Sequence, residues 1–158
     1  MQKNKQIGFI VTDTTASELS FSLIKGINDY IDDGGKEDFT VFFENSSANI
    51  IEPNFATMSM SEIWNFDGNL ISTNVSTSLS MNKCFAPISK YFYVWDLEWI
   101  RNHGREYEKT IQAFIPKEIK LIARSEDHAK AIENYSNRKV DYIIENINIE
   151  KIVRMTNE

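Results

Sequence analysis

The sequence predicts an α/β protein of the three-layer Rossmann-like type, in which helices cover both faces of a mostly parallel sheet of about six strands. Short runs rich in β-branched and aromatic residues, such as "QIGFIV" and "FTVFFEN", alternate along the chain with amphipathic segments. Strands that are apolar almost throughout are typical of a parallel sheet that is buried on both faces. The chain shows no internal repeat or change of composition, so residues 1–158 are expected to form a single domain.

The predicted strands are the runs in which apolar, β-branched and aromatic side chains follow one another with few interruptions. They are expected at residues 6–11, 39–45, 69–73, 91–96, 119–124 and 140–146. In the fourth of these runs, Tyr91, Tyr93 and Trp95 point to the same face, so we expect core packing for all three.

The predicted helices lie between these strands. In the first, Leu19, Leu23, Ile27 and Ile31 recur every four residues, and the pair Gly34-Gly35 provides a stop. The second begins at Ser59, three residues before Glu62, which is the spacing of a capping box. Helical segments are therefore expected at residues 16–35, 59–66, 78–85, 105–115 and 126–136, with a last turn at 149–155.

Composition excludes several classes of function. The net charge of −6 argues against nucleic acid as the main partner, because phosphate binding needs a basic face. Cys84 is the single cysteine, so no intramolecular disulfide is possible and a reducing, cytoplasmic location fits best. His103 and His128 do not have the spacing of metal ligands, so no metal is expected.

The sequence also lacks the patterns of a signal peptide, a membrane-spanning helix and a nucleotide-binding loop. The short basic start is followed by an apolar run too short for a signal peptide, and no segment is long and apolar enough to span a membrane. With six glycines, the chain has neither a dinucleotide-binding glycine motif nor a P-loop, so no nucleotide cofactor is expected.

Polar residues follow the predicted strands, where open parallel sheets bind ligands at the carboxyl ends of their strands. Carboxylates, hydroxyls and aromatic faces at such an edge are suited to recognising a sugar or a ribose. Asp96 and Asp13 are the candidate catalytic residues, since a carboxylate whose pKa is raised by burial can act as a general base. The candidate ligand-binding residues are Thr14, Asn74, Glu98, Trp99, Arg124, Ser125 and His128.

Structural roles compete with these functional ones. Thr15 and Ser125 are also explained as helix N-caps, and Asp96 is in a position to cap the segment that follows it. Trp99 lies beyond the fourth strand and is therefore expected to be the exposed aromatic of this edge. Cys84 is expected to be buried as a small apolar side chain.

The segment "IKLIARSEDHAKAIENYSNRKVDYIIENINIEKI" resembles the end of the N-terminal, acceptor-side half of GT-B glycosyltransferases. In that family a strand leads to a serine, a helix follows, and a further strand ends in an asparagine-containing turn; here these positions are Ser125, residues 126–135 and Asn146. The aromatic run "YFYVWDLEW" also matches a strand of that family that leads into a polar loop. The resemblance covers about the last seventy residues.

This resemblance implies a sugar or nucleotide-sugar ligand, with acceptor contacts on Asp13, Thr14, Asn74, Asp96 and Ser125. GT-B enzymes bind the nucleotide-sugar mainly in a second Rossmann-like domain, and the loop after the first strand often contains glycines. Because "IVTDTTASEL" contains no glycine, the resemblance implies an acceptor-binding half that acts with a donor-binding partner subunit, or a domain that has lost the reaction.

Two other functions remain open. The segment "IGFIVTDTTASELSFSLIKGINDYI" resembles the first strand and helix of sugar-sensing domains of the LacI and periplasmic-binding type. Alternatively, the domain binds a host protein through Trp64, Phe66 and Trp99 without catalysis; the abundance of Asn, Ile and Lys is typical of AT-rich genomes such as those of many phages.

Overall fold

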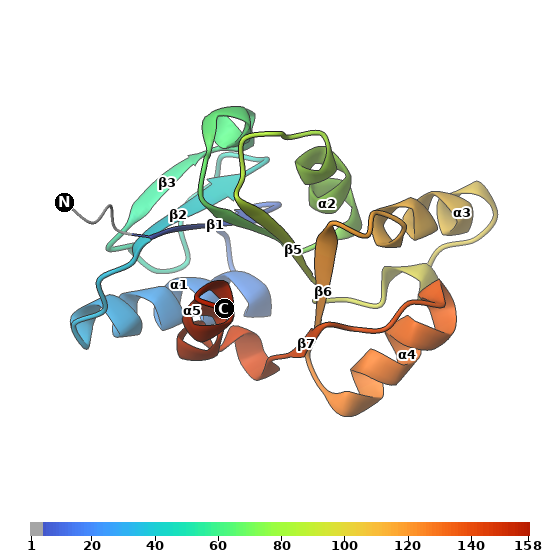
Figure 1. Cartoon of the computed structure of the whole chain (residues 1–158). Helices are drawn as coiled ribbons and strands as arrows, with labels where there is room; N and C mark the ends of the chain where they lie inside the picture. Colours follow the sequence, from blue (N-terminus) through green and yellow to red (C-terminus); the bar gives the residue numbers. More distant parts are fainter. Residues whose placement is uncertain (1–4) are drawn as a thin grey trace.

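In the part of the chain that the structure describes, seven parallel strands form one sheet in the order β3-β2-β1-β4-β5-β6-β7 (Figure 1). The computed structural model describes residues 5–158; the first residues of the basic start lie outside this range. The strands are β1 (Gln6–Val11), β2 (Asp38–Phe43), β3 (Ala56–Ser59), β4 (Asn69–Ser72), β5 (Ser89–Tyr93), β6 (Ile119–Ala123) and β7 (Tyr142–Ile143). The parallel, helix-covered Rossmann-like sheet is confirmed, with seven strands in place of about six.

The additional strand is β3, which the sequence analysis missed. It pairs only with β2 and forms the edge of the sheet, so Ala56, Met58 and Ser59 remain exposed. An edge strand does not need to be apolar on both faces, and "ATMS" therefore lacks the pattern that reveals the central strands. At the other edge, β7 is shorter than predicted because the chain turns sharply after Ile144.

Helices cover the two faces of the sheet in two separate groups. Helices α1 (Glu18–Asp32) and α5 (Ile149–Thr156) lie side by side on one face (Figure 1). The opposite face is covered by α2 (Val75–Asn82), α3 (Arg105–Ile111) and α4 (Glu126–Ser136). Four short 3-10 helices complete the fold: η1 (Met60–Asn65), η2 (Glu98–Ile100), η3 (Gln112–Phe114) and η4 (Glu145–Ile147).

Four helical segments differ from the prediction, and one of them is the predicted helix 105–115, which is divided into α3 and η3. The segment after Ser59 is the 3-10 helix η1, and Ser59 accepts a hydrogen bond from the Ser61 N–H. Helix α2 begins three residues before the predicted 78–85, because Asn74 and Thr77 form a capping box there. The predicted last turn is the full helix α5, whose apolar side chains pack against the sheet.

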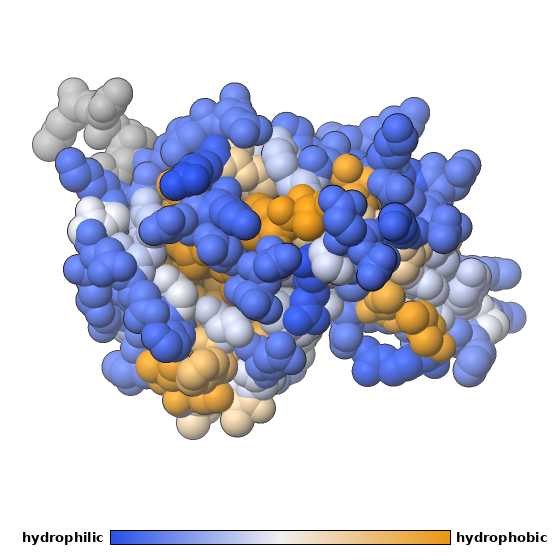
Figure 2. Space-filling view, turned by 90° about the horizontal axis from the view of Figure 1, so that it is seen from below, coloured by the Kyte–Doolittle hydropathy of each residue, from blue (hydrophilic) through white to orange (hydrophobic). Residues whose placement is uncertain are grey.

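Alternation along the strands divides the core into two apolar layers. On β1, Phe9 packs toward α1 and α5, whereas its neighbour Ile10 packs toward the opposite helices. Tyr93 and Phe92 are divided in the same way on β5, and Cys84 is buried in the second layer as predicted. Figure 2 shows the molecule from the side of α1 and α5: hydrophobic side chains gather there in separate groups among hydrophilic ones.

A buried hydroxyl holds the turn after β7 in an unfavourable conformation. Asn146 and Ile147 have φ angles of 48° and 52°, a left-handed conformation that a β-branched residue such as Ile147 rarely adopts. The Tyr93 hydroxyl, which is fully buried, accepts a hydrogen bond from the Ile147 N–H at 3.0 Å and donates one to the Ile144 carbonyl. Tyr93 thus fixes this turn at the edge of the sheet.

We expect Tyr93→Phe to lower the free energy of unfolding by about 1–3 kcal/mol, because it leaves a buried N–H and a buried carbonyl without this partner. Urea denaturation followed by circular dichroism measures the change. Tyr107→Phe is the matched control, since Tyr107 is exposed and its loss of a hydroxyl is expected to change stability by less than about 0.5 kcal/mol. Equal stability of the two variants would contradict the role given to Tyr93.

Candidate functional site

A polar cleft opens at the carboxyl ends of β1 and β4, where the direction of the chain across the sheet reverses. From β1 the chain passes through α1 to β2, and from β4 it passes through α2 to β5 on the other side. Open α/β sheets bind ligands at such a switch point. We call the hollow the rim cleft: it has a volume of about 350 Å³ and is lined by residues 11–13, 17–20, 73–74, 95–96, 98 and 101.

Side-chain hydrogen bonds across the sheet hold the floor of the rim cleft. The Thr73 hydroxyl donates to the Ile10 carbonyl at 2.7 Å, and Asn74 Nδ2 donates to the Thr12 hydroxyl at 2.8 Å. Asn74 Oδ1 also accepts a hydrogen bond from the Thr77 N–H, which caps α2. The predicted ligand-binding Asn74 therefore lies in the cleft, and most of its hydrogen-bonding capacity is already used by the protein.

Asp13 orders the loop between β1 and α1. Its Oδ1 atom accepts hydrogen bonds from the Thr15 N–H at 3.1 Å and from the Thr15 hydroxyl at 2.6 Å. Thr15 therefore does not cap α1 as expected; Ser17 does, by accepting from the Ser20 N–H. The Thr14 side chain is buried and donates to Asn49 at 2.6 Å, so it is not part of the cleft lining.

The two carboxylates after β5 have different surroundings. Asp96 is largely exposed and pairs with Arg101 at 2.6 Å; it does not cap the 3-10 helix that follows. Glu98 is less accessible, and its Oε2 atom accepts a hydrogen bond from the Val75 N–H at the start of α2, at 2.8 Å. Burial raises the pKa of the Glu98 carboxyl above its usual value, which this hydrogen bond only partly offsets. The burial of Glu98 therefore favours its protonated form and makes it a candidate proton acceptor in the cleft.

Trp95, and not Trp99, is the aromatic residue of the rim cleft. The core packing expected for Trp95 is only partial: its half-buried side chain packs against the core layer below α1 and α5 and also lines the cleft. The Arg124 guanidinium lies 3.8 Å from the centre of the Trp95 ring and donates to the Trp95 carbonyl at 3.2 Å. The prediction that Trp99 is the exposed aromatic of this edge is wrong: it stacks on Tyr135 at 4.1 Å and meets Phe114 edge-on. Phe66 is likewise buried, so it is unavailable for a protein contact.

A second hollow, of about 330 Å³, lies beside the rim cleft at the ends of β6 and β7. The structure brings together here the predicted Arg124, Ser125 and His128 with Glu145 and Asn146, which the sequence analysis did not select as ligand-binding. Ser125 caps α4 by accepting from the His128 N–H at 3.1 Å, as expected. Burial and the nearby Arg124 lower the pKa of His128, so its imidazole is neutral at pH 7.

The charge of the rim cleft limits the ligands that fit it. Asp13, Glu18, Asp96 and Glu98 line it together with one cationic side chain, Arg101. Hydroxyl groups of a ligand can donate to these carboxylates, whereas a phosphate group would be repelled. Within residues 5–158, no cluster of three or more His, Cys, Asp or Glu side chains is arranged to hold a metal ion. No helix in this range is long and apolar enough to cross a bilayer.

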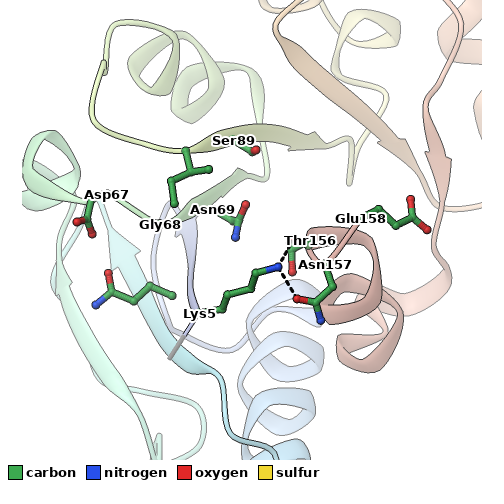
Figure 3. A pocket seen from close by; sticks show the side chains of 10 residues that line it. Lys5, Asp67, Gly68, Asn69, Ser89, Thr156, Asn157 and Glu158 are labelled. Atoms are coloured by element: carbon green, nitrogen blue, oxygen red, sulfur yellow. Dashed lines mark hydrogen bonds between the residues drawn. The ribbon is translucent and has the colours of Figure 1, made fainter. Parts of the chain in front are cut away.

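A hollow of about 390 Å³ at the opposite, amino-terminal edge of the sheet is less suited to a ligand (Figure 3). The Lys5 ammonium group points across it and donates to the Thr156 carbonyl at 3.0 Å and to Asn157 Oδ1 at 2.6 Å. Its most prominent cation is therefore already satisfied by the protein, and it lacks an aromatic side chain. The rim cleft remains the better candidate site.

Comparison of the chain with protein-family models, with curated proteins and with solved structures finds no match. Function is therefore inferred from the position, the side chains and the charge of the rim cleft.

We expect the stability difference between Glu98→Gln and the wild type to depend on pH. The raised pKa of Glu98 means that the folded state holds its proton more tightly than the unfolded state, so the wild type loses stability as pH rises from about 4.5 through the folded pKa. A glutamine does not ionise, and its oxygen can still accept from the Val75 N–H. We measure thermal unfolding between pH 4.5 and 8 and expect the unfolding temperature of Glu98→Gln to rise relative to that of the wild type as pH rises. Asp96→Asn, at an exposed site, is the matched control. A difference that does not vary with pH would contradict the burial of Glu98.

Proposed function

We propose that this domain binds a neutral sugar in the rim cleft and serves as the acceptor-side half of a glycosyltransferase-like assembly. The observation that carries the proposal is the lining of the cleft: carboxylates, hydroxyls and the Trp95 side chain meet at the switch point of a Rossmann-like sheet. Carboxylates are strong acceptors for sugar hydroxyls, and an aromatic ring offers an apolar surface to the C–H groups of a sugar.

Charge favours a sugar over a nucleotide as the ligand of this cleft. Four carboxylates line the cleft, and only Glu18 and Asp96 are paired with an arginine, namely Arg124 and Arg101; the net negative charge disfavours a diphosphate, which carries negative charge itself. The loop after β1 also differs from a phosphate-binding loop: it contains no glycine, and Asp13 occupies its Thr15 N–H. Under the proposal, the nucleotide-sugar donor is supplied by a partner subunit.

The residues of the cleft take distinct roles in this proposal. Asp13 and Asp96, predicted as catalytic, hold sugar hydroxyls; both already accept hydrogen bonds from the protein, which orient their carboxylates. Glu98 is the general base that accepts the proton of the acceptor hydroxyl during transfer, because its burial favours the protonated form. Trp95 places the sugar ring, and Arg124 holds Trp95 in position.

The proposal is tested by nuclear magnetic resonance titration of the ¹⁵N-labelled domain with a panel of neutral mono- and disaccharides and, separately, with uridine diphosphate. We expect at least one sugar to shift the amide signals of residues 12–20, 73–75 and 95–98, and the diphosphate to leave them unchanged. Trp95→Ala is expected to weaken sugar binding about tenfold or more, which corresponds to a loss of at least about 1.4 kcal/mol of binding free energy. Trp64→Ala, at an exposed tryptophan outside the cleft, is the matched control.

The outcomes separate this proposal from its alternatives. Shifts with the diphosphate and none with any sugar would overturn it. Glycosyl transfer from a nucleotide-sugar by the isolated domain would show that no donor-binding partner is needed. Sugar binding that releases or recruits a regulatory partner, without transfer in any mixture, would instead support the sugar-sensing function.

A further inference from the structure

The loop between α2 and β5 exposes two large apolar side chains at the edge of the sheet opposite the rim cleft. Phe85 is 98% exposed and Ile88 is 78% exposed, the two highest values among the large exposed hydrophobic residues. We call residues 83–88 the apical loop. Exposing large apolar side chains to water is energetically unfavourable, so their position indicates a binding surface.

The exposure of these side chains is built into the fold. At the start of the apical loop, Cys84 is fully buried and its N–H donates to the Met81 carbonyl at 3.0 Å. At its end, the Ile88 N–H donates to the Gly68 carbonyl at 3.0 Å, which fastens the loop to the start of β4. These hydrogen bonds fix the backbone at both ends of the apical loop, and Phe85 and Ile88 point into solvent.

Basic side chains surround the apical loop, although the protein as a whole carries a charge of −6. Lys83 belongs to the loop, and Lys90 and Lys120 line the shallow hollow beside it. Lys117 lies two residues before Ile119, which pairs with Lys90 at the start of β5, so it belongs to the same edge of the sheet. The acidic side chains nearby are Glu118, Asp67 and Glu158, against Lys83, Lys90, Lys117 and Lys120, so cations are in slight excess here, in contrast to the rim cleft.

We propose that the apical loop docks the protein onto an anionic lipid surface. Phe85 and Ile88 enter the boundary between headgroups and acyl chains, and the lysines contact the headgroups. Two protruding side chains on a narrow loop fit a fluid lipid surface better than a protein partner, because a stable protein interface buries about 800 Å² on each side. The rim cleft lies at the opposite edge of the sheet and stays open to water in this orientation. This docking is independent of the function proposed for the rim cleft.

The test is flotation of the whole chain with vesicles of phosphatidylcholine alone and with vesicles that contain roughly 30% phosphatidylserine. We expect binding to the anionic vesicles only, and its loss at an ionic strength of about 0.5 M. Lys83→Gln with Lys117→Gln is expected to weaken partitioning about 25-fold, at about fivefold for each lysine. Phe85→Ser with Ile88→Ser is expected to remove the binding while leaving the folded structure unchanged, since both side chains are exposed.

Two control variants carry the same chemical changes far from the apical loop. Phe21→Ser replaces an exposed aromatic on α1, and Lys130→Gln replaces an exposed lysine on α4; both are expected to bind as the wild type does. The proposal is overturned if the wild type floats with neither kind of vesicle, or if the variant Phe85→Ser with Ile88→Ser binds the anionic vesicles as well as the wild type does. A dimer in solution that disappears with this double substitution, without vesicle binding, would identify a second copy of the chain as the occupant and also overturn it.

Discussion

Two hydrogen bonds between the ends of β1 and β4 hold together the part of the molecule on which the rim cleft depends. Thr73 donates to the carbonyl of Ile10, and Asn74 donates to Thr12, so segments more than sixty residues apart in sequence are joined at this point. Asn74 also starts α2, whose first N–H groups include the one that holds Glu98. A single amide side chain therefore connects the sheet, a helix and the carboxylate whose pKa is raised.

The parallel sheet also explains how several carboxylates can lie close together in the rim cleft. Helices α1, α2 and α4 each follow a strand, so all three begin at the rim, where the positive ends of their dipoles favour negative charge. Glu18 lies in the first turn of α1, and Glu98 accepts from the first N–H of α2. The same architecture directs the carboxyl ends of these helices toward the opposite edge, where the negative ends of their dipoles favour cations, and lysines lie there around the apical loop. The carboxyl-terminal edge of the sheet is thus acidic, whereas lysines are more frequent at the amino-terminal edge.

The central strands were predictable because each is buried on both faces and so must be apolar along most of its length. Strand β3 escaped prediction because an edge strand is half exposed, and β7 was overestimated because Ile144, although apolar, already belongs to the turn that Tyr93 holds. Helix caps were predictable where one polar residue precedes a periodic segment, as at Ser125. They were misplaced where several hydroxyl residues compete, as between Thr15 and Ser17.

The fold class could be read from the residues alone, because the alternation of apolar and amphipathic segments is a local property that each segment carries. The presence of polar residues after the strands was equally predictable. Which of these residues meet depends on tertiary contacts, since strand order arises from pairing between distant segments and one residue of register reverses the direction of a side chain. The same holds outside the strands, where packing against distant segments places each side chain: Trp95 lines the cleft while Trp99 packs against Tyr135, and Phe85 is exposed beside a buried Cys84.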